Sequence, residues 1–453
     1  MRRVVIASLA LVGGGLFLAY SLAQPPAVPT PPAPPALVGD GQADDTAAVQ
    51  GLVDRGGLVH LPKGTYRLTR PVVVDEKAGF TAIQGDTVAR VVMAGPGPAF
   101  RFLGTHGGSA APSTMKPVVW ERERMPALDG VEIVGNHADA DAVEASGTVQ
   151  LTITRVLIRE CRHGIRLTSR NRNVVISNCH VYHNRGIGIF FDGVNLHQTN
   201  VTGSHVSYNA GGGIVVRGGE VRNLQITGCD IEANHGKDVP PTANVFIDST
   251  GGTNAEVAIT GNTIQHTHDA PDSANVRIKG PSIKWPQADE LRDGNVTITG
   301  NIMSDAQVNV HLDHARGVVM TGNTLWTAYA HNLLVENSSN VVVGSNVLDR
   351  NPRYVREETP ATTNAVVFRN CSDSTVTGLH VSGVRAAAAG IAFEKCDRFH
   401  VANCTVLDCE PVGMLLKDVT RSRIVGNLIR DDRPGTKSVP LKTEGGSGNV
   451  IVE

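Results

Sequence analysis

Hydrophobic and polar residues alternate at period two in short runs along most of the chain, and the runs themselves recur. One phrase reads ISNCHV at Ile176, ITGNTI at Ile259 and IVGNLI at Ile424. Its fourth residue marks a column in which successive members are 23, 25, 25, 33, 39, 22, 23, 33, 25 and 23 residues apart. A base period near 23 residues with occasional insertions predicts a solenoid.

The local pattern decides which solenoid this is. Leucine-rich repeats share the period, but these runs are rich in Val and Ile, alternate at period two and are separated by Gly and Asn, which is typical of strands. Short strands stacked at the roughly 4.8 Å strand spacing form a parallel β-helix, in which equivalent positions of successive coils lie in rows. The sequence therefore predicts an all-β fold.

Two inward rows of aliphatic side chains follow from this alignment. The first comprises Ile153, Ile176, Val201, Ile226, Ile259, Ile298, Met320, Val343, Val376, Val401 and Ile424. The second comprises Ile158, Val181, Val206, Ile231, Ile264, Met303, Leu325, Leu348, Val381, Val406 and Ile429. Between them lies the marker column: Val156, Cys179, Ser204, Cys229, Asn262, Asn301, Asn323, Asn346, Leu379, Cys404 and Asn427. There a short polar side chain can bond turn backbone groups and tolerate a left-handed conformation.

Composition agrees with narrow coils and argues against several classes of function. Glycine is abundant, at 49 residues, and aromatic residues make up only 4% of the chain. A formal net charge of −2 argues against a nucleic-acid or anionic-membrane partner. The sequence has no phosphate-binding glycine motif at a strand-to-helix junction and no CxxC pair, so it predicts no nucleotide, zinc or other cofactor. The use of Ca²⁺ stays open, because the sequence does not indicate it, and the sequence sets no oligomeric state.

The first residues have the features of an export signal. Arg2 and Arg3 precede an apolar stretch from Val4 to Ala19, and a small-residue cleavage site ends at Ala23. We expect a signal peptide over 1–23, a Pro-rich linker over 24–36 and a β-helix domain over 37–453, with an entry and cap over 37–75 and repeated coils over 130–453. The alternative is an uncleaved membrane anchor. Either predicts an exported protein, secreted, periplasmic or associated with the cell envelope.

Seven cysteines in an exported chain suggest disulfides, yet the number is odd and their positions follow the repeats. We expect most of them to be small buried fillers. Cys371 and Cys396 follow strands one coil apart, so they are the one pair that a disulfide could bridge.

The segment from Gly39 to Val74 carries a motif of its own, GDGQADDTAAVQGLVDRGGLVHLPKGTYRLTRPVVV. Asp45 can cap a short helix from Thr46 to about Asp54, followed by a strand at Leu58–Leu61. Such a helix can cover the open end of a β-helix.

This segment closely resembles the start of the pectate-lyase-like superfamily domain found in rhamnogalacturonase, polygalacturonase-related and epimerase-like proteins and in some phage tailspikes. The matching residues include GDG at Gly39, DDT at Asp44 and LPKGTY at Leu61. The resemblance implies a single-stranded right-handed parallel β-helix with a short N-terminal capping helix, and a carbohydrate theme. The motif is structural, so it implies no catalytic residue.

A further strand recurs in each repeat with two outward positions. They give the columns Arg166, Gly188, Val215, Phe246, Arg277, His311, Leu334, Val367, Ala392, Leu415, and Thr168, Phe190, Arg217, Asp248, Lys279, Asp313, Glu336, Arg369, Glu394, Lys417. The middle of this face concentrates charge, and Asn244, Asn275, Asn309 and Asn332 lead the same strands. Insertions at 235–243, 266–274, 281–293 and 351–363 would wall it into a groove.

This face supplies the candidate site. Asp313 and Glu336 lie one coil apart, close enough for repulsion to raise the pKa of one and pair an acid with a base. We take Asp313, Glu336 and His311 as candidate catalytic residues. The candidate substrate-binding residues are Asp248, Arg277, Lys279, Arg369 and Phe246, in which the basic groups can neutralise a uronate carboxylate. The competing interpretation is that alternating charges on an exposed sheet are ordinary ladder pairs.

Specific catalytic motifs are missing. Arg277-Ile278-Lys279 resembles an element of polygalacturonases, but the Asn-Thr-Asp, Asp-Asp and Gly-His-Gly companions do not precede it on successive strands, nor is there the pectate lyase Arg-Asp-Pro pattern. His266 and His268 could hold a metal, although a solvated loop explains them as well. Two functions remain open: an enzyme that cleaves or epimerises an acidic polysaccharide, or a catalytically silent β-helix that binds glycan or serves the cell envelope.

Overall fold

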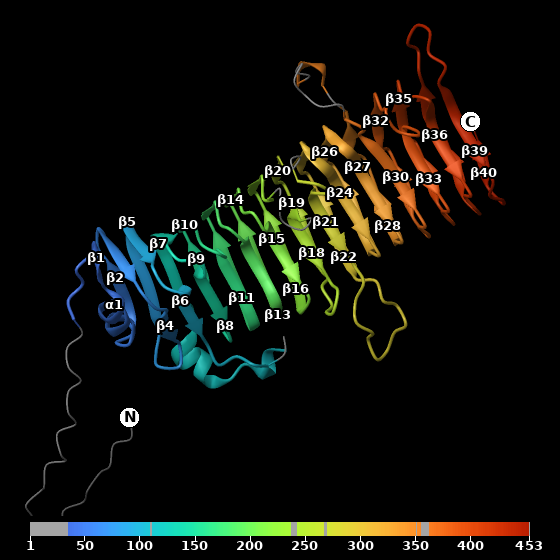
Figure 1. Cartoon of the computed structure of the whole chain (residues 1–453). Coiled ribbons are helices and arrows are strands. Elements are labelled where there is room, and N and C mark those ends of the chain that lie inside the picture. The colour runs from blue at the N-terminus through green and yellow to red at the C-terminus, as the bar shows by residue number, and fades with distance from the viewer. Residues whose placement is uncertain are drawn as a thin grey trace, which may run out of the picture.

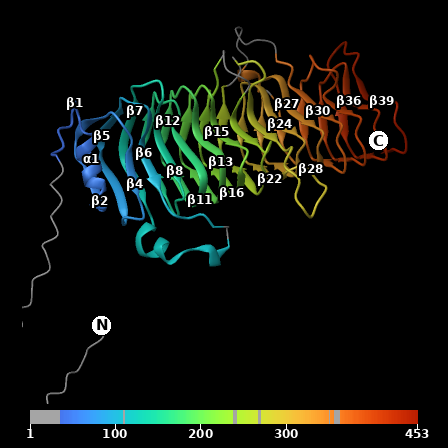
Figure 2. The ribbon, with the colours of Figure 1, turned by 60° about the horizontal axis from the view of Figure 1, so that its bottom comes forward.

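The computed structural model describes residues 35–108, 111–236, 242–266, 270–349, 351–354 and 362–452. Over these ranges the chain winds into a rod of stacked coils with its first and last coils at opposite ends (Figures 1 and 2). The named strands form one continuous set of 40, paired in parallel from coil to coil. The predicted all-β parallel β-helix is therefore confirmed.

Each coil contributes to three parallel sheets that surround the core, and β5, β7, β11 and β13 each run through two of them. Sheet 1 contains β4 (Val72–Asp75), β6 (Gly97–Leu103), β8 (Ala140–Ser146), β11 (Ile165–Ser177), β13 (Ile187–Thr202), β15 (Gly212–Arg217), β18 (Ala243–Asp248), β21 (Ala274–Lys279), β24 (Ala306–Asp313), β27 (Ala328–Glu336), β30 (Ala365–Arg369), β33 (Ile391–Glu394), β36 (Val412–Lys417) and β39 (Val439–Glu444).

Sheet 2 contains β2 (Gly57–Leu61), β5 (Thr81–Met93), β7 (Ala127–Gly135), β9 (Thr152–Thr154), the ends of β11 and β13, β16 (Glu220–Thr227), β19 (Val257–Thr260), β22 (Gly294–Thr299), β25 (Arg316–Thr321), β28 (Ser339–Val343), β31 (Thr375–Thr377), β34 (His400–Ala402), β37 (Arg423–Val425) and β40 (Val450–Val452). Sheet 3 contains β1 (Asp40–Asp44), β3 (Gly64–Leu68), the ends of β5 and β7, β10 (Leu157–Arg159), β12 (His180–Tyr182), β14 (His205–Ser207), β17 (Asp230–Glu232), β20 (Thr263–Gln265), β23 (Ile302–Met303), β26 (Thr324–Leu325), β29 (Val347–Leu348), β32 (His380–Ser382), β35 (Thr405–Leu407) and β38 (Leu428–Arg430).

Helices are short and lie outside the sheets. Besides α1 (Thr46–Val53), the described residues form two 3₁₀ turns, η1 (Pro112–Thr114) and η3 (Pro352–Tyr354), and one π turn, η2 (Val119–Glu123). None of these helices has the length and apolar character needed to cross a bilayer. The expected signal peptide at 1–23 and nearly all of the expected linker at 24–36 lie outside the described residues.

The two predicted inward rows are confirmed position by position. Ile298 pairs with Ile259 on one side and Met320 on the other, and the remaining members are register partners in the same way. The second row is equally continuous from Ile158 to Ile429. Almost all of these side chains are buried in one core that runs the length of the rod.

The marker column forms a ladder of side-chain bonds at the turn between sheets 2 and 3. Asn301 illustrates it: its amide donates to Asn323 Oδ1 and Ile259 O, both at 2.9 Å, and its own Oδ1 accepts from the Asn262 backbone N–H at 3.0 Å. The left-handed residue is the one before the column, as at Gly261 (φ 66°) and Gly300 (φ 67°). The column itself therefore does not take the left-handed conformation that we expected for it.

The helix α1 lies at the N-terminal end of the rod (Figure 1) and places Val49 and Val53 in the core. The expected cap differs in detail. Asp45 occupies the N-cap position, but its carboxylate accepts the backbone N–H groups of Val38 and Gly39 instead of one from the helix. The first helical N–H, at Thr46, donates to Asp44 Oδ1 at 3.0 Å.

All seven cysteines are buried and free, which fits the predicted role as small fillers. Cys371 and Cys396, the pair that a disulfide could bridge, are unbridged. Their sulfur atoms contact the backbone oxygens of Val335 at 3.4 Å and Phe368 at 3.5 Å, respectively.

Candidate functional site

The outer face of sheet 1 carries the predicted rows of outward side chains. In the row nearer the strand ends, Asp248, Lys279, Asp313, Glu336 and Arg369 are consecutive register partners. The neighbouring row runs through Phe246, Arg277, His311 and Leu334. The structure thus brings all of the predicted site residues together on one face.

One coil was misaligned in the prediction. Phe190 pairs with Arg166 and with Val215, and Asp192 pairs with Thr168 and with Arg217. We had placed Gly188 and Phe190 in those positions. The repeated Gly-Ile of GIGIFFD offers two alignments that differ by two residues, and both keep the same side chains facing outward. Alternation alone cannot distinguish them.

Arg277 is the most enclosed of the predicted cations, with 7% of its surface exposed. Its Nη2 donates to Asp272 O at 2.6 Å and to Asp272 Oδ1 at 3.0 Å, and its Nε donates to His311 Nδ1 at 3.2 Å. Burial lowers the pKa of this guanidinium from its usual value. The Nε and Nη2 groups of Arg277 are therefore committed within the protein, and Nε holds His311 in place.

His311 links Arg277 to the carboxylates. Burial, followed by the charge of Arg277, lowers the pKa of His311 below 6.5, so the ring is neutral at neutral pH. Because Nδ1 accepts from Arg277, the proton lies on Nε2, which donates to Glu336 Oε2 at 3.3 Å. Glu336 Oε1 also accepts from Arg369 Nη1 at 2.8 Å, and Arg369 Nε donates to Glu394 Oε2 at 2.8 Å.

Asp313 and Lys279 are less committed. Asp313 Oδ1 accepts from Asn337 Nδ2 at 3.0 Å and contacts His314 Nδ1 at 2.6 Å, while Oδ2 has no partner among the described residues. The Lys279 side chain is 42% exposed and makes one loose ion pair, 3.9 Å from Asp248. These two residues are register partners on β21 and β24, so an accessible cation lies beside an accessible carboxylate.

Apolar side chains flank this charged region on the outer face. Phe246 is 9% exposed and belongs to a cluster with Phe190, Val215, Leu334 and Val367. Phe246 is therefore packed among other outward side chains, which limits the surface that it can offer to a ligand.

Two residues near Arg277 and His311 were not identified from the sequence. Asp272 contacts Arg277, and His331 lies on β27 with its Nδ1 buried and unpaired among the described residues. Burial lowers the pKa of His331, and His311, Glu336 and Arg369 all contribute to its field. His331 directly precedes Asn332, where we began the repeated strand, so extending the pattern by one residue would have included it.

The asparagines that lead these strands do not line a groove. Asn244, Asn275, Asn309 and Asn332 are at most 2% exposed and form a second buried amide ladder, with steps of 2.9, 2.7 and 2.8 Å between side chains. Like the marker column, they satisfy turn backbone and fix the stacking of coils.

Of the four insertions predicted to wall the groove, one lies wholly within the described residues. Residues 237–241, 267–269 and 355–361, which belong to three of the four insertions, lie outside the described ranges, and so does His268. The fourth insertion, 281–293, is described, and Trp285, Arg292 and Asp293 from it line a hollow over sheet 2.

Comparisons with known proteins agree with this architecture. A family model described as a right handed beta helix region matches residues 126–264, and the model of the periplasmic copper-binding protein NosD matches residues 258–429. A search of curated protein sequences gives no significant match.

Among solved structures, the tailspike protein of E. coli bacteriophage HK620, in a mutant form bound to a pentasaccharide, matches 91% of this chain and 77% of its own, with a TM-score of 0.54 and 13% identity. The A-module of Azotobacter vinelandii mannuronan C-5 epimerase AlgE4 matches 92% and 98% of the two chains at a TM-score of 0.40 and 14% identity. The chain therefore has the right-handed parallel β-helix fold.

The residues described do not fit a copper site. Copper favours imidazole, thiolate and thioether ligands. No group of three or more His, Cys, Asp or Glu in the described ranges has the arrangement to hold a metal ion. The four cysteines within the NosD match are buried, and their thiols bond to backbone carbonyls. The copper named by that family is therefore not carried over to this chain.

Proposed function

We propose that this protein binds an acidic polysaccharide across the outer face of sheet 1 and modifies it by proton transfer at Asp313. The observation that carries the proposal is that Lys279 and Asp313 are register partners on adjacent strands. Lys279 makes one loose ion pair and Asp313 Oδ2 has no partner among the described residues, whereas the neighbouring charged side chains bond to one another. The pentasaccharide in the tailspike complex supports a glycan as the ligand class.

The residues have distinct roles in this proposal. Lys279 neutralises the carboxylate of a uronate, which makes the adjacent C–H more acidic, and Asp313 Oδ2 accepts that proton. His311 and Glu336 are positioning residues, because their polar atoms already bond to Arg277, to Arg369 and to each other. Elimination then breaks the bond to the glycosidic oxygen, which leaves with a proton from water, whereas delivery of a proton from water to the opposite face gives an epimer. Hydrolysis is the third outcome, and it differs in that Glu336 would act as the second carboxylate of a pair with Asp313 instead of as a positioning residue.

The full chain should be tested against polyuronates and neutral glucans by reducing ends, by ultraviolet absorbance of a new double bond and by deuterium uptake from D₂O. Deuterium uptake reports proton abstraction whether the bond is cleaved or epimerised. Asp313→Asn should lower turnover by roughly 10²–10⁴-fold with little loss of binding, because the amide keeps the shape but cannot accept a proton.

Lys279→Ala should instead weaken binding, with a salt dependence smaller than that of the unaltered chain. Lys417→Ala is the matched control, since Lys417 occupies the same outward row several coils away. Full activity in Asp313→Asn, Glu336→Gln and His311→Ala alike would show that this face is ordinary ladder surface.

The second candidate is a catalytically silent glycan-binding β-helix. The committed network of Arg277, His311, Glu336 and Arg369 favours it, because such ladder pairs need no catalytic explanation. Saturable polyuronate binding with no turnover or deuterium uptake would support this alternative. We also propose export, from the signal-like residues 1–23 and the periplasmic family matched at 258–429.

A further inference from the structure

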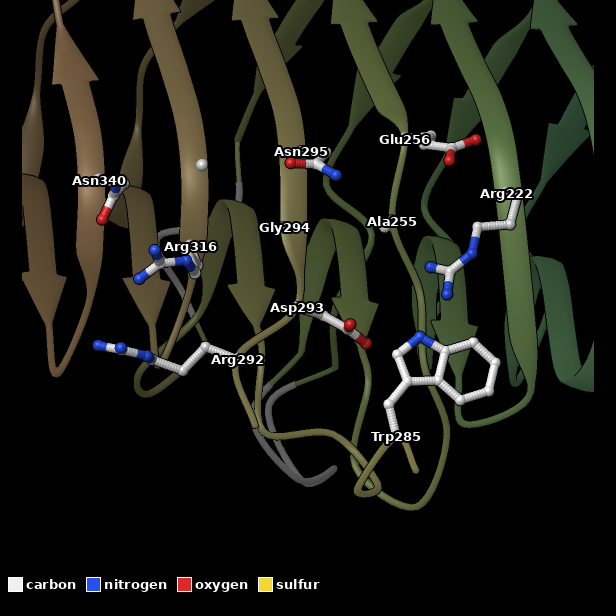
Figure 3. A pocket seen from close by; sticks show the side chains of 11 residues that line it. Arg222, Ala255, Glu256, Trp285, Arg292, Asp293, Gly294, Asn295, Arg316 and Asn340 are labelled. Carbon is white, nitrogen blue, oxygen red and sulfur yellow. The ribbon is translucent and has the colours of Figure 1, made fainter. Parts of the chain in front are cut away.

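A hollow of about 630 Å³ lies on the outer face of sheet 2 (Figure 3), whereas the charged rows belong to sheet 1. Its floor comes from four strands of sheet 2, β16, β22, β25 and β28, and from residues just before β19, which lies between β16 and β22. The loop between β21 and β22 forms its rim. Volumes of about 300–1,000 Å³ are usual for small-molecule sites.

The rim loop is attached to the body of the rod at several points. The two halves of the loop are joined by a hydrogen bond in which Ser282 N donates to Leu291 O at 2.8 Å, and Ile283 N donates to Gly252 O at 3.0 Å. At its end, the Asp293 carboxylate accepts the backbone N–H of Asn254 at 2.7 Å and contacts the Thr253 hydroxyl at 3.2 Å. The loop therefore holds Trp285 at a defined place on the rim.

Trp285 presents an aromatic surface at this edge. Half of its surface (50%) is exposed, although a side chain of this size would gain stability from burial. In Figure 3 its indole faces the hollow on the same side as the guanidinium of Arg222. A half-exposed ring over a polar hollow is suited to stacking against the C–H face of a sugar.

Arginine side chains with spare N–H donors line the rest of the hollow. Arg222 Nη2 donates to Thr253 Oγ1 at 2.8 Å, but its Nη1 is buried and has no hydrogen-bond partner among the described residues. Arg292 and Arg316 share the single carboxylate of Glu290, at 2.7 and 3.2 Å. An unpaired buried donor is costly unless a ligand or water meets it, and a carboxylate meets it best.

We propose that this hollow binds a uronic-acid residue of an acidic glycan, with the sugar ring on Trp285 and its carboxylate on Arg222. Asp293, Glu256 and Asn295 supply acceptors and an amide for the hydroxyl groups. Two acids line the same space, so the double charge of a phosphate is disfavoured more strongly than the single charge of a uronate carboxylate. The proposal does not depend on any reaction at sheet 1.

The test uses hexagalacturonate as the probe and maltohexaose as its neutral counterpart, with the full chain carrying Lys279→Ala and Asp313→Asn so that the charged row of sheet 1 is disabled. Titration calorimetry and tryptophan fluorescence should both show saturable binding of hexagalacturonate. Trp285→Ala and Arg222→Gln should each weaken it roughly tenfold or more, while Trp285→Phe, which keeps a ring, should retain most of it.

Two matched controls are available. Trp120 is equally exposed, at 50%, but lies in η2, and Arg172 occupies the column of Arg222 two coils earlier. Trp120→Ala and Arg172→Gln should leave binding unchanged. The proposal is overturned if hexagalacturonate does not bind, if maltohexaose binds equally well, or if binding survives Trp285→Ala and Arg222→Gln. Failure of catalysis at sheet 1 would affect none of these measurements.

Discussion

The inner and outer faces of the same strands differ in how strongly the repeat constrains them. On β22, Ile298 is fully buried between Ile259 and Met320, whereas its neighbour Thr297 is exposed. Every coil meets the same surroundings inside, so the inner rows stay aliphatic from one end to the other. Outside, each coil meets solvent or a loop of its own, so the outer rows differ and can carry function.

The largest contrast should come from placing a charge on either side of β22. Ile298→Asp puts an unpaired carboxylate in the core, which should cost roughly 3–5 kcal/mol of unfolding free energy. Thr297→Asp, one residue away, should change it by less than about 0.5 kcal/mol. Urea unfolding of both variants measures the difference. Similar stabilities would mean that the inner and outer faces are wrongly assigned.

A second prediction concerns Glu76, a carboxyl group buried next to the core at 1% exposure. Burial, followed by the charges of Glu123 and Asp75, raises its pKa to about 9. A raised carboxyl pKa gives stability that is complete below the unfolded pKa of 4.5 and is lost as pH rises towards 9. Between these pH values the ionisation of Glu76 should lower the free energy of unfolding by about 1.4 kcal/mol per pH unit.

Glu76→Gln should abolish this contribution, so the variant should lose less stability than the unaltered chain between pH 5 and pH 8. Thermal unfolding across that range measures the two slopes. Glu121→Gln, at an exposed position, is the control and should leave the slope unchanged. Parallel pH profiles for the Glu76→Gln variant and the unaltered chain would contradict the assignment.

The amide ladder should give an intermediate effect. Asn301→Ala removes an acceptor from the Asn262 N–H and a donor from Ile259 O, both buried, and should cost roughly 1–3 kcal/mol. Asn200→Ala alters an exposed amide on β13 and should be close to neutral. Chemical denaturation compares the two. An equal loss in both would show that the ladder contributes no more than surface amides do.

The same contrast explains how much could be predicted from the sequence. The inward rows from Ile153 to Ile424 were predictable because alternation and period leave one consistent alignment. Gly188 was misplaced because a repeated Gly-Ile allows two alignments of the same parity. The buried ladder of Asn244 and its relatives was missed because a polar residue at a strand start says nothing about whether its side chain points into a ladder.

The candidate sites show where prediction from the repeat ends. The contacts of Arg277 with Asp272 depend on how a loop returns to its strand, which the repeat does not encode. The hollow beneath Trp285 depends likewise on the direction of the loop at 281–293, which we had assigned to a wall of sheet 1. Side chains placed by strands were predictable by position, whereas those placed by insertions required the structure.

The smallest effect should come from an outer ion pair that carries no site. Arg101 Nε donates to Glu144 at 2.9 Å in the outward row that continues to Arg277 and His311, and Glu144 also contacts Arg166 at 3.3 Å. Because Arg166 remains as a partner, Arg101→Gln should cost less than about 1 kcal/mol. At 1 M salt, where screening acts within roughly 3 Å, the difference should shrink further. Denaturation at low and high salt measures it, and a cost comparable to that of Ile298→Asp would show that the outer rows stabilise the fold as strongly as the inner ones.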